Sequence, residues 1–202
     1  MADVPEPVFT EHVEAVTAKK DELTSAGVLR LAKPHVSHNS GYNEWYTPSE
    51  YIEAARRVMG SIDLDPASSQ EANTVVKATA YYTIEDDGLS RDWSGRVWLN
   101  PPYSANIIGH FSDKAVTEYQ SGRVSEAVIL VNNATETGWF AALAEVSASV
   151  CFLRSRVKFW RPDGDTNSPL QGQAVLYMGT NPALFEKEFS CLGWCARIRR
   201  QK

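Results

Sequence analysis

The 202-residue sequence contains no apolar run long enough to cross a membrane and no Gly-x-Gly-x-x-Gly turn. A membrane-spanning helix needs about 18 or more consecutive apolar residues, so we expect no membrane segment. Its three cysteines, an odd and small number for this length, do not make a disulfide framework. The first residues, MADVPEPVFTEHVEA, lack a basic region followed by an apolar one, so no export signal is predicted. We therefore expect a reduced, cytoplasmic protein.

The sequence also lacks an excess of positive charge. It has 20 Lys and Arg against 25 Asp and Glu, a formal net charge of -5, which counts against a protein that coats nucleic acid without preference. The charge is uneven, however: residues 1–100 hold 9 basic and 16 acidic side chains, whereas residues 151–202 hold 9 and 4. If DNA binds, we expect it at the C-terminal quarter.

The length and the absence of internal repeats predict one main domain. Residues 1–40 are interpreted as an N-terminal arm or extension, and residues 41–202 as the domain. Within the arm, Phe9, Val13, Val16 and Leu23 could line one face of a helix. The domain begins with Thr47 as a helix N-cap and Pro48 in the first turn, followed by apolar residues at helical spacing up to Gly60.

Alternating strand and helix patterns follow. Strands are predicted within residues 61–68, 95–104, 126–134, 148–160 and 173–179, and helices over 107–119 and 137–146. This order predicts an α/β fold with three layers and a mostly parallel sheet. The last two strands are joined without a helix, which predicts an antiparallel C-terminal edge.

Unusual residues stand where the predicted strands end, which is where ligands bind in such sheets. They are Asp63-Leu64-Asp65-Pro66, Asn100-Pro101-Pro102-Tyr103 and Asn132-Asn133. The two prolines remove two backbone donors and fix φ, so the carbonyls of Asn100 and Pro101 have no ladder partner. An amide oxygen, a free carbonyl and an aromatic ring at one bend can accept hydrogen bonds from a planar amine and stack on its ring.

Asn100-Pro101-Pro102-Tyr103 resembles the catalytic tetrad of amino-group methyltransferases that use S-adenosylmethionine. With Glu44-Trp45-Tyr46-Thr47-Pro48, Asp63-Leu64-Asp65-Pro66-Ala67-Ser68 and Asp87-Gly88-Leu89 with Trp93, the order resembles phage-type Dam-like adenine DNA methyltransferases. The similarity runs from about Asn43 to Gly179. It implies a Rossmann-like methyltransferase, phage or prophage origin within a bacterial host cell, and double-stranded DNA as partner, with no metal.

By resemblance, Asn100 and Pro101 accept the two amine hydrogens of a flipped adenine, Pro102 completes the bend, and Tyr103 stacks on the base. Cofactor contacts are implied for Tyr46, Thr47, Pro48, Asp63, Asp65, Pro66, Ala67 and Asp87. Asp65-Pro66-Ala67-Ser68 stands where most Rossmann-like methyltransferases have a Gly-rich turn. Only 34 residues separate Asp65 from Asn100, so we expect a pruned sheet with one short strand near Thr79 to Thr83. For Asp87, a purely structural turn stays equally open.

A cationic stretch predicts the DNA contacts. Arg154, Arg156, Lys158 and Trp160 would share one face of a strand, with Arg161 beside them. An edge strand protected by charge is the alternative, and the tetrad favours DNA. Arg197, Arg199, Arg200 and Lys202 could add phosphate contacts. A zinc site from His35, His38, Cys191 and Cys195 fits no usual spacing.

Two other functions stay open at this point: a DNA-binding relative without activity, and an amino-group methyltransferase acting on cytosine N4 or protein glutamine. The recognition sequence and the oligomeric state cannot be read from the chain, because base contacts come from loops.

Overall fold

The computed structural model describes residues 46–103, 107–161, 166–167 and 171–199. Contacts divide the chain into two units, Met1–Glu44 and Trp45–Lys202, and the description below concerns the second. The arm predicted for residues 1–40, with its helix, lies outside the described residues. No helix in the described part of the chain is both long and apolar enough to cross a membrane.

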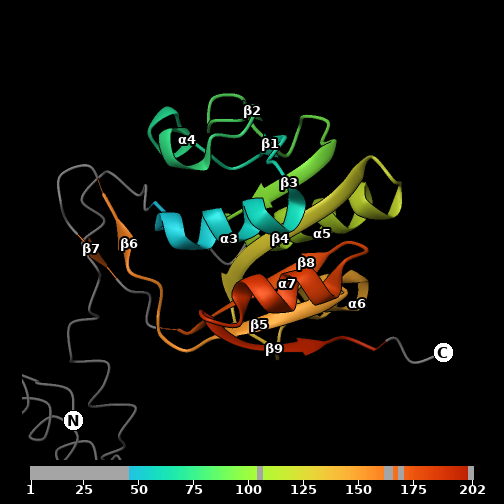
Figure 1. Cartoon of the computed structure of the whole chain (residues 1–202). Coiled ribbons are helices and arrows are strands. Elements are labelled where there is room, and N and C mark those ends of the chain that lie inside the picture. Colours follow the sequence, from blue (N-terminus) through green and yellow to red (C-terminus); the bar gives the residue numbers. More distant parts are fainter. Residues whose placement is uncertain (1–45, 104–106, 162–165, 168–170, 200–202) are drawn as a thin grey trace, which may run out of the picture. The chain divides into compact units, whose positions relative to one another are not determined.

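Seven strands form one mixed sheet in the order β2-β1-β3-β4-β8-β5-β9 (Figure 1). Their bounds are β1 Leu64–Asp65, β2 Ala80–Tyr81, β3 Gly95–Leu99, β4 Val124–Asn132, β5 Ser149–Leu153, β8 Gln173–Met178 and β9 Gly193–Arg197. Strands β1 to β5 run in one direction, and β8 and β9 run in the opposite direction. The long apolar run of β4 places it in the middle of the sheet, where both of its faces are buried.

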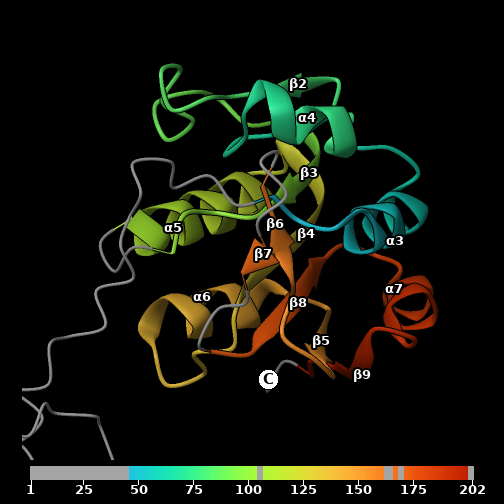
Figure 2. The same cartoon turned by 90° about the vertical axis from the view of Figure 1, so that its left-hand side faces the viewer.

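Helices cover both faces of this sheet, as the turned view shows (Figure 2). Helices α3 (Ser49–Met59) and α7 (Pro182–Phe189) lie on one face, and α5 (Ile107–Gln120) and α6 (Gly138–Val146) on the other. Successive β4 side chains alternate between the two layers: Val128 packs with α3 and α7, Ile129 with α5 and α6. The predicted three-layer, Rossmann-like α/β fold is confirmed.

The region between the first two main strands is pruned, as expected. It contains the short helix α4 (Gln70–Val76) and strand β2, which falls within the predicted 79–83 segment. The helices predicted over 107–119 and 137–146 are α5 and α6, and Thr137 caps α6 by accepting a hydrogen bond from the amide of Phe140 at 3.4 Å.

The C-terminal half of this sheet is antiparallel, as predicted, but this part of the sheet has one more strand than the sequence indicated. Strand β8 pairs with both β4 and β5, and β9 is the outermost strand. Neither α7 nor β9 was predicted, because Gly193–Arg197 is short and shows no clear alternation of buried and exposed residues.

The strand predicted over 148–160 is wrong as one element. Strand β5 ends at Leu153, and Phe159–Trp160 forms β6, which pairs with β7 (Thr166–Asn167) in a separate two-stranded sheet. The backbone is diverted between them because the amide of Val157 donates to the buried side chain of Gln173 at 3.0 Å.

The predicted cap of the first helix is also wrong. Helix α3 begins at Ser49, its N-cap position is Pro48, and no side chain caps it. Thr47 therefore does not serve the helix.

Candidate active site

The two strands that follow β1 in the sequence lie on opposite sides of it in the sheet. The chain passes from β1 to β2 on one side, and the next strand, β3, lies on the other. At such a switch point the carboxyl ends of neighbouring strands leave room for a ligand. Asp65 ends β1, and Asn100 follows Leu99, the last residue of β3. The structure thus brings two predicted site residues to one edge of the sheet.

The Asn100 amide is held between two hydroxyl groups. Its Nδ2 donates to Thr47 Oγ1 at 3.2 Å, and its Oδ1 accepts from the Tyr103 hydroxyl at 2.8 Å. The oxygen keeps a second lone pair for another donor. Among the turn and loop hydrogen bonds of the described residues, none ends on the carbonyl of Asn100 or Pro101. The bend therefore offers three oxygen acceptors close together in the chain.

Tyr103 is packed beside this amide. Its ring meets Phe159 edge-on with centroids 6.4 Å apart, and its hydroxyl also lies 3.4 Å from the carbonyl oxygen of Leu130. Burial raises the pKa of Tyr103 well above its usual value, so the phenol stays protonated and remains a donor. Of the two prolines, Pro101 is buried and Pro102 is exposed.

The segment Tyr46–Pro48 lies against the same bend. Tyr46 and Trp160 exchange two backbone hydrogen bonds, of 2.9 and 3.0 Å, and their rings pack with centroids 5.1 Å apart. The Trp160 indole N–H donates to the carbonyl of Thr47 at 3.4 Å. The structure therefore brings Tyr46, Thr47 and Pro48 together with Asn100.

The turn after β1 contains a carboxyl group removed from water. Asp65 is 3% exposed, and burial raises its pKa to about 7, which the amide of Ala67, donating to Oδ1 at 3.3 Å, only partly offsets. Ser68 lies near enough to favour the carboxylate, yet its buried Oγ has no hydrogen-bond partner of good geometry among the described residues. Pro66 is also buried. A buried, unsatisfied hydroxyl beside a carboxyl group is suited to a polar ligand group.

Asp63 lies at the other end of β1, before the strand begins. Its two carboxylate oxygens accept from Arg96 Nε and Nη2, each at 2.9 Å, and the Arg96 amide and the Ser61 hydroxyl add bonds of 2.9 Å. The hydrogen bonds from the Arg96 side chain lower the pKa of Asp63 to about 2. The expectation of a carboxylate at the end of the first strand thus fits Asp65, and the structure does not bring Asp63 to the switch point.

Asp87 belongs to a loop that packs on the turn after β1. It adopts φ of +52°, its Oδ1 accepts from the amide of Leu89 at 3.2 Å, and its side chain is exposed. A side chain on Gly88 would overlap the carbonyl oxygen of Pro66, and the fully buried Trp93 donates its indole N–H to Gly88 at 2.7 Å. The geometry of Asp87 is that of a local turn-forming side chain.

Most of the chain matches a known protein family. The sequence profile of the family Dam, DNA N-6-adenine-methyltransferase, matches residues 36–183, which is more than half of the chain. The chain belongs to the Dam family. It is also similar to the DNA N-6-adenine-methyltransferase of Escherichia phage T1, with 31% identity over 113 residues, covering 55% of this chain and 44% of that relative. The matched part is therefore less than half the length of the phage protein.

In this Dam-family chain the cationic stretch 154–161 begins at the same sheet edge as Asn100, because β5 runs parallel to β3 and β4. Arg156 and Lys158 are exposed, whereas Val157 and Phe159 between them are buried. This alternation is that of an extended segment, and it points two cations outward.

The other predicted DNA contacts are arranged differently, because the stretch is not one strand. Arg154 is exposed and donates to the carbonyl of Ser190 at 3.3 Å. The Trp160 ring packs on Tyr46 and is half-buried, as is Arg161. Arg154, Arg156, Lys158 and Trp160 therefore do not share one strand face.

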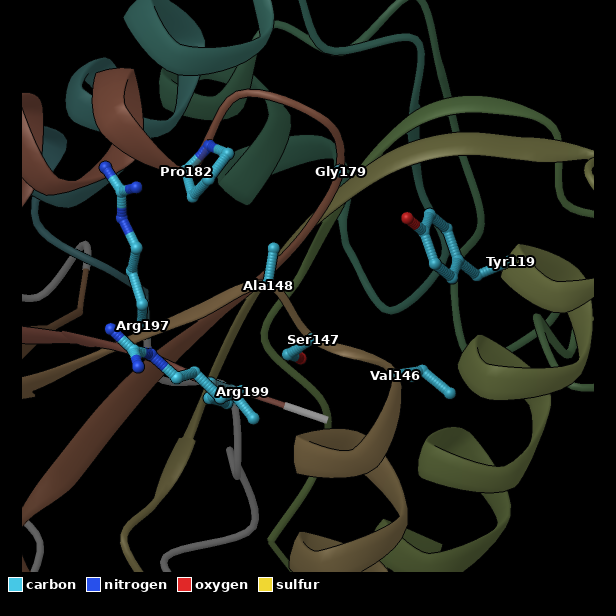
Figure 3. A pocket seen from close by; sticks show the side chains of 9 residues that line it. Tyr119, Val146, Ser147, Ala148, Gly179, Pro182, Arg197 and Arg199 are labelled. Atoms are coloured by element: carbon cyan, nitrogen blue, oxygen red, sulfur yellow. The ribbon is translucent and has the colours of Figure 1, made fainter. Parts of the chain in front are cut away.

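Arg197 and Arg199 lie at the opposite edge of the sheet, since β9 runs antiparallel to β5 and ends there. Together with Tyr119, Ser147 and Gly179 they line a cavity of about 440 Å³ (Figure 3). Arg197 is already paired with both oxygens of Glu186 at 2.7 and 3.2 Å. Apart from Arg197 and Arg199, this cavity contains none of the predicted site residues. Arg200 and Lys202 lie outside the described residues.

Sequence reasoning missed two polar anchors of the Dam-family site. Gln173 is 1% exposed and donates to Asn132 Oδ1 at 3.2 Å while accepting from Val157, so it joins the ends of β4 and β8 to the cationic stretch. Its signal was a single amide at the head of an apolar strand, QAVLYM. The other is the bond from Asn100 to Thr47, a residue for which the resemblance implied a cofactor contact; this bond spans 53 positions and left no local pattern.

The described residues provide no support for the zinc site. His35 and His38 lie outside the described residues, and the described part of the chain has no cluster of three or more His, Cys, Asp or Glu placed to hold a metal ion. Cys191 is exposed, and Cys195 instead faces Cys151 across β5 and β9.

Proposed function

We propose that this chain transfers a methyl group from S-adenosylmethionine to the exocyclic N6 amine of adenine in double-stranded DNA. Membership of the Dam family supports the reaction class. The observation that carries the proposal is the bend at Asn100, which follows β3 at the same sheet edge as Asp65. It carries the amide oxygen and two carbonyls that accept no turn or loop hydrogen bond from the described residues.

The reaction requires no covalent bond between the protein and its substrate. The adenine amine is a poor nucleophile, because its lone pair is delocalised into the ring. In this proposal Asn100 Oδ1 and the Pro101 carbonyl accept hydrogen bonds from the two N–H groups of the adenine amine. This favours a pyramidal nitrogen whose lone pair points towards the methyl donor. Catalysis then consists of positioning and of fixed dipoles that need no reorganisation.

The residues after β1 fit S-adenosylmethionine as a ligand. When bound, the cofactor supplies an electrophilic methyl group on a sulfonium centre. Its ammonium and ribose hydroxyl groups need buried acceptors, and Asp65 with the unsatisfied Ser68 hydroxyl offers them. Pro66 and Ala67 shape that turn, with Tyr46 and Pro48 on the neighbouring segment. We assign Asp63 to the Arg96 ion pair and Asp87 to its own turn, and to no cofactor contact.

The DNA would approach from the same edge. Arg156 and Lys158 point outward there and would contact phosphates, with Arg154 and Arg161 flanking them. Enzymes that act on a base within a duplex turn it out of the stack, and aromatic rings commonly receive it. The Tyr103 hydroxyl bonds the amide acceptor, and we propose that the adenine lies against the Tyr103 ring.

The deciding experiment compares Asn100→Ala with Asn181→Ala. Asn181 caps α7 at the opposite sheet edge, where its Oδ1 accepts from Leu184 at 3.2 Å, so both variants lose one structural amide. Each protein is incubated with unmethylated double-stranded DNA and methyl-labelled S-adenosylmethionine, and the DNA is digested to nucleosides. We expect label in N6-methyladenosine for wild type and Asn181→Ala, and none for Asn100→Ala.

The digest also separates the alternatives. Label in N4-methylcytosine, or in protein glutamine, would replace adenine as the substrate. If wild-type protein bound DNA and the cofactor but labelled neither DNA nor protein, this result would contradict the proposal and favour a DNA-binding relative without activity. Equal labelling by Asn100→Ala would remove the amide from the mechanism.

A further inference from the structure

Thr47 has a buried hydroxyl that no local structure requires. The side chain is 5% exposed, precedes the proline at the N-cap of α3, and does not cap that helix. Its hydroxyl oxygen accepts a hydrogen bond from Asn100 Nδ2 at 3.2 Å. A contact between residues so far apart in sequence depends on the tertiary fold and not on helix formation.

The backbone around Thr47 is fixed on both sides. Before it, Tyr46 exchanges backbone hydrogen bonds of 2.9 and 3.0 Å with Trp160, and the Trp160 indole bonds the Thr47 carbonyl. After it, Pro48 restricts φ and leads into α3. The hydroxyl is therefore presented to Asn100 at a fixed place instead of by a mobile loop.

A primary amide can be turned through 180° about its last bond, which exchanges its donor and acceptor ends. Only one orientation gives an incoming amine an oxygen. With Tyr103 donating to Oδ1 and Thr47 accepting from Nδ2, the amide is held at both ends.

We propose that Thr47 is a positioning residue for the methyl transfer: it fixes the Asn100 amide so that the oxygen, and not the NH₂ group, meets the target amine. This assignment rests on the proposed function of Asn100, and it replaces the cofactor contact that the sequence suggested for Thr47. Thr47 acts through Asn100 and touches neither substrate nor donor.

The test uses Thr47→Val, which keeps the shape and removes the hydroxyl, and Thr47→Ser, which keeps the hydroxyl. Thr117→Val serves as the control, because its hydroxyl donates to the Asp113 carbonyl within α5, at 2.8 Å, and makes no other hydrogen bond to the described residues. The first readout is NMR of the Asn100 side-chain ¹⁵N–¹H₂ pair, assigned by its loss in Asn100→Ala. We expect this pair to shift in Thr47→Val and to keep its wild-type position in Thr47→Ser and Thr117→Val.

The second readout separates rate from binding. Loss of one orienting hydrogen bond should lower kcat for DNA methylation about 10-fold in Thr47→Val, with recovery in Thr47→Ser. The calorimetric affinity for S-adenosylmethionine should change less than about twofold, because a lost hydrogen bond to the cofactor would cost more. A loss of affinity in step with kcat would overturn the inference and return Thr47 to the cofactor.

The two proposals fail in different ways. Unchanged Asn100 signals and unchanged kcat in Thr47→Val would overturn the positioning role while leaving the methyl transfer established. Wild-type protein that transfers no methyl group, but whose Asn100 signals depend on Thr47, would overturn the proposed function and leave the orientation of the amide supported.

Discussion

At the scale of single residues, two aspartates two positions apart have opposite electrostatic surroundings. Asp65 is buried with few compensating donors, and its pKa is raised to about 7. Asp63 faces Arg96, and its pKa is lowered to about 2. The difference follows from their positions along the chain: Asp63 precedes β1 and meets Arg96 near the start of β3, whereas Asp65 ends β1 at the switch point.

The two shifts predict opposite pH dependences of stability. A raised carboxyl pKa disfavours the native state increasingly as pH rises from about 4 to 7, whereas a lowered pKa stabilises it above about 4 and loses that effect as pH falls towards 2. The free energy of unfolding of Asp65→Asn, relative to that of wild type, should therefore increase by on the order of 2–3 kcal/mol between pH 5 and pH 8. Asp63→Asn should be less stable than wild type by about 1 kcal/mol at pH 7; the loss is small because the ion pair is one-third exposed. The difference in stability should vanish near pH 2.

Urea denaturation at several pH values measures both effects, with each variant as the control for the other. Parallel pH profiles for the two variants would show that burial does not set the Asp65 pKa. Asp63→Asn should also retain methyl transfer at pH 7, because the Asp63 carboxylate is engaged by Arg96 at the start of β3 and not by the proposed site.

Single residues were predictable where the chemistry was local. The double proline at 101–102 fixes its bend wherever it folds, so Asn100 was placed correctly at the end of β3. The roles of Thr47 and Ser68 were not predictable, because the partner of Thr47 and the burial of the Ser68 hydroxyl depend on tertiary packing. Asp63 and Asp65 looked alike in sequence, because the bounds of a strand only two residues long, such as β1, cannot be read from a sequence pattern.

At the scale of elements, the loop Asp87–Trp93 packs on the turn that replaces a Gly-rich loop. Gly88 touches the Pro66 carbonyl too closely for any side chain, and the Trp93 indole bonds the Gly88 carbonyl. The motif Asp-Gly-Leu with a later Trp thus has a structural reason: it supports the turn at Asp65.

This contact predicts contrasting effects for two glycine substitutions. Gly88→Ala should destabilise the protein by about 2 kcal/mol or more, because a Cβ would collide with rigid backbone. Gly109→Ala in α5 meets nothing within 4 Å and should stabilise by about 0.5–1 kcal/mol. Thermal unfolding followed by circular dichroism measures both. Equal stability of Gly88→Ala and wild type would mean that the loop does not press on the turn.

Helices and central strands were predictable, and the C-terminal elements were less so. The apolar patterns of α5, α6 and β4 are long and regular, so the period alone identifies them. The stretch 148–160 reads as one strand, because nothing local shows that Gln173 takes the amide of Val157 and breaks the ladder.

At the scale of the whole molecule, charge is distributed by edge of the sheet. Exposed Arg156 and Lys158 follow β5 at the edge that carries Asn100, whereas Arg197 and Arg199 end β9 at the opposite edge. The basic C-terminal quarter predicted from composition is therefore two separate groups. The whole chain has a net charge of -5, so we expect this first group of cations to guide DNA to the site.

This separation predicts that two single arginine losses act differently on DNA binding. Arg156→Ala and Arg199→Ala each remove one exposed guanidinium, so their net charges are identical. If Arg156 contacts a phosphate, its loss should weaken DNA affinity at every sequence tested and reduce the slope of log K against log salt by about 1. Arg199→Ala should keep the wild-type slope, because its edge faces away from Asn100. Fluorescence anisotropy with a labelled duplex at several salt concentrations measures the slope, and equal reductions in both variants would show that overall charge, not the position of Arg156, governs binding.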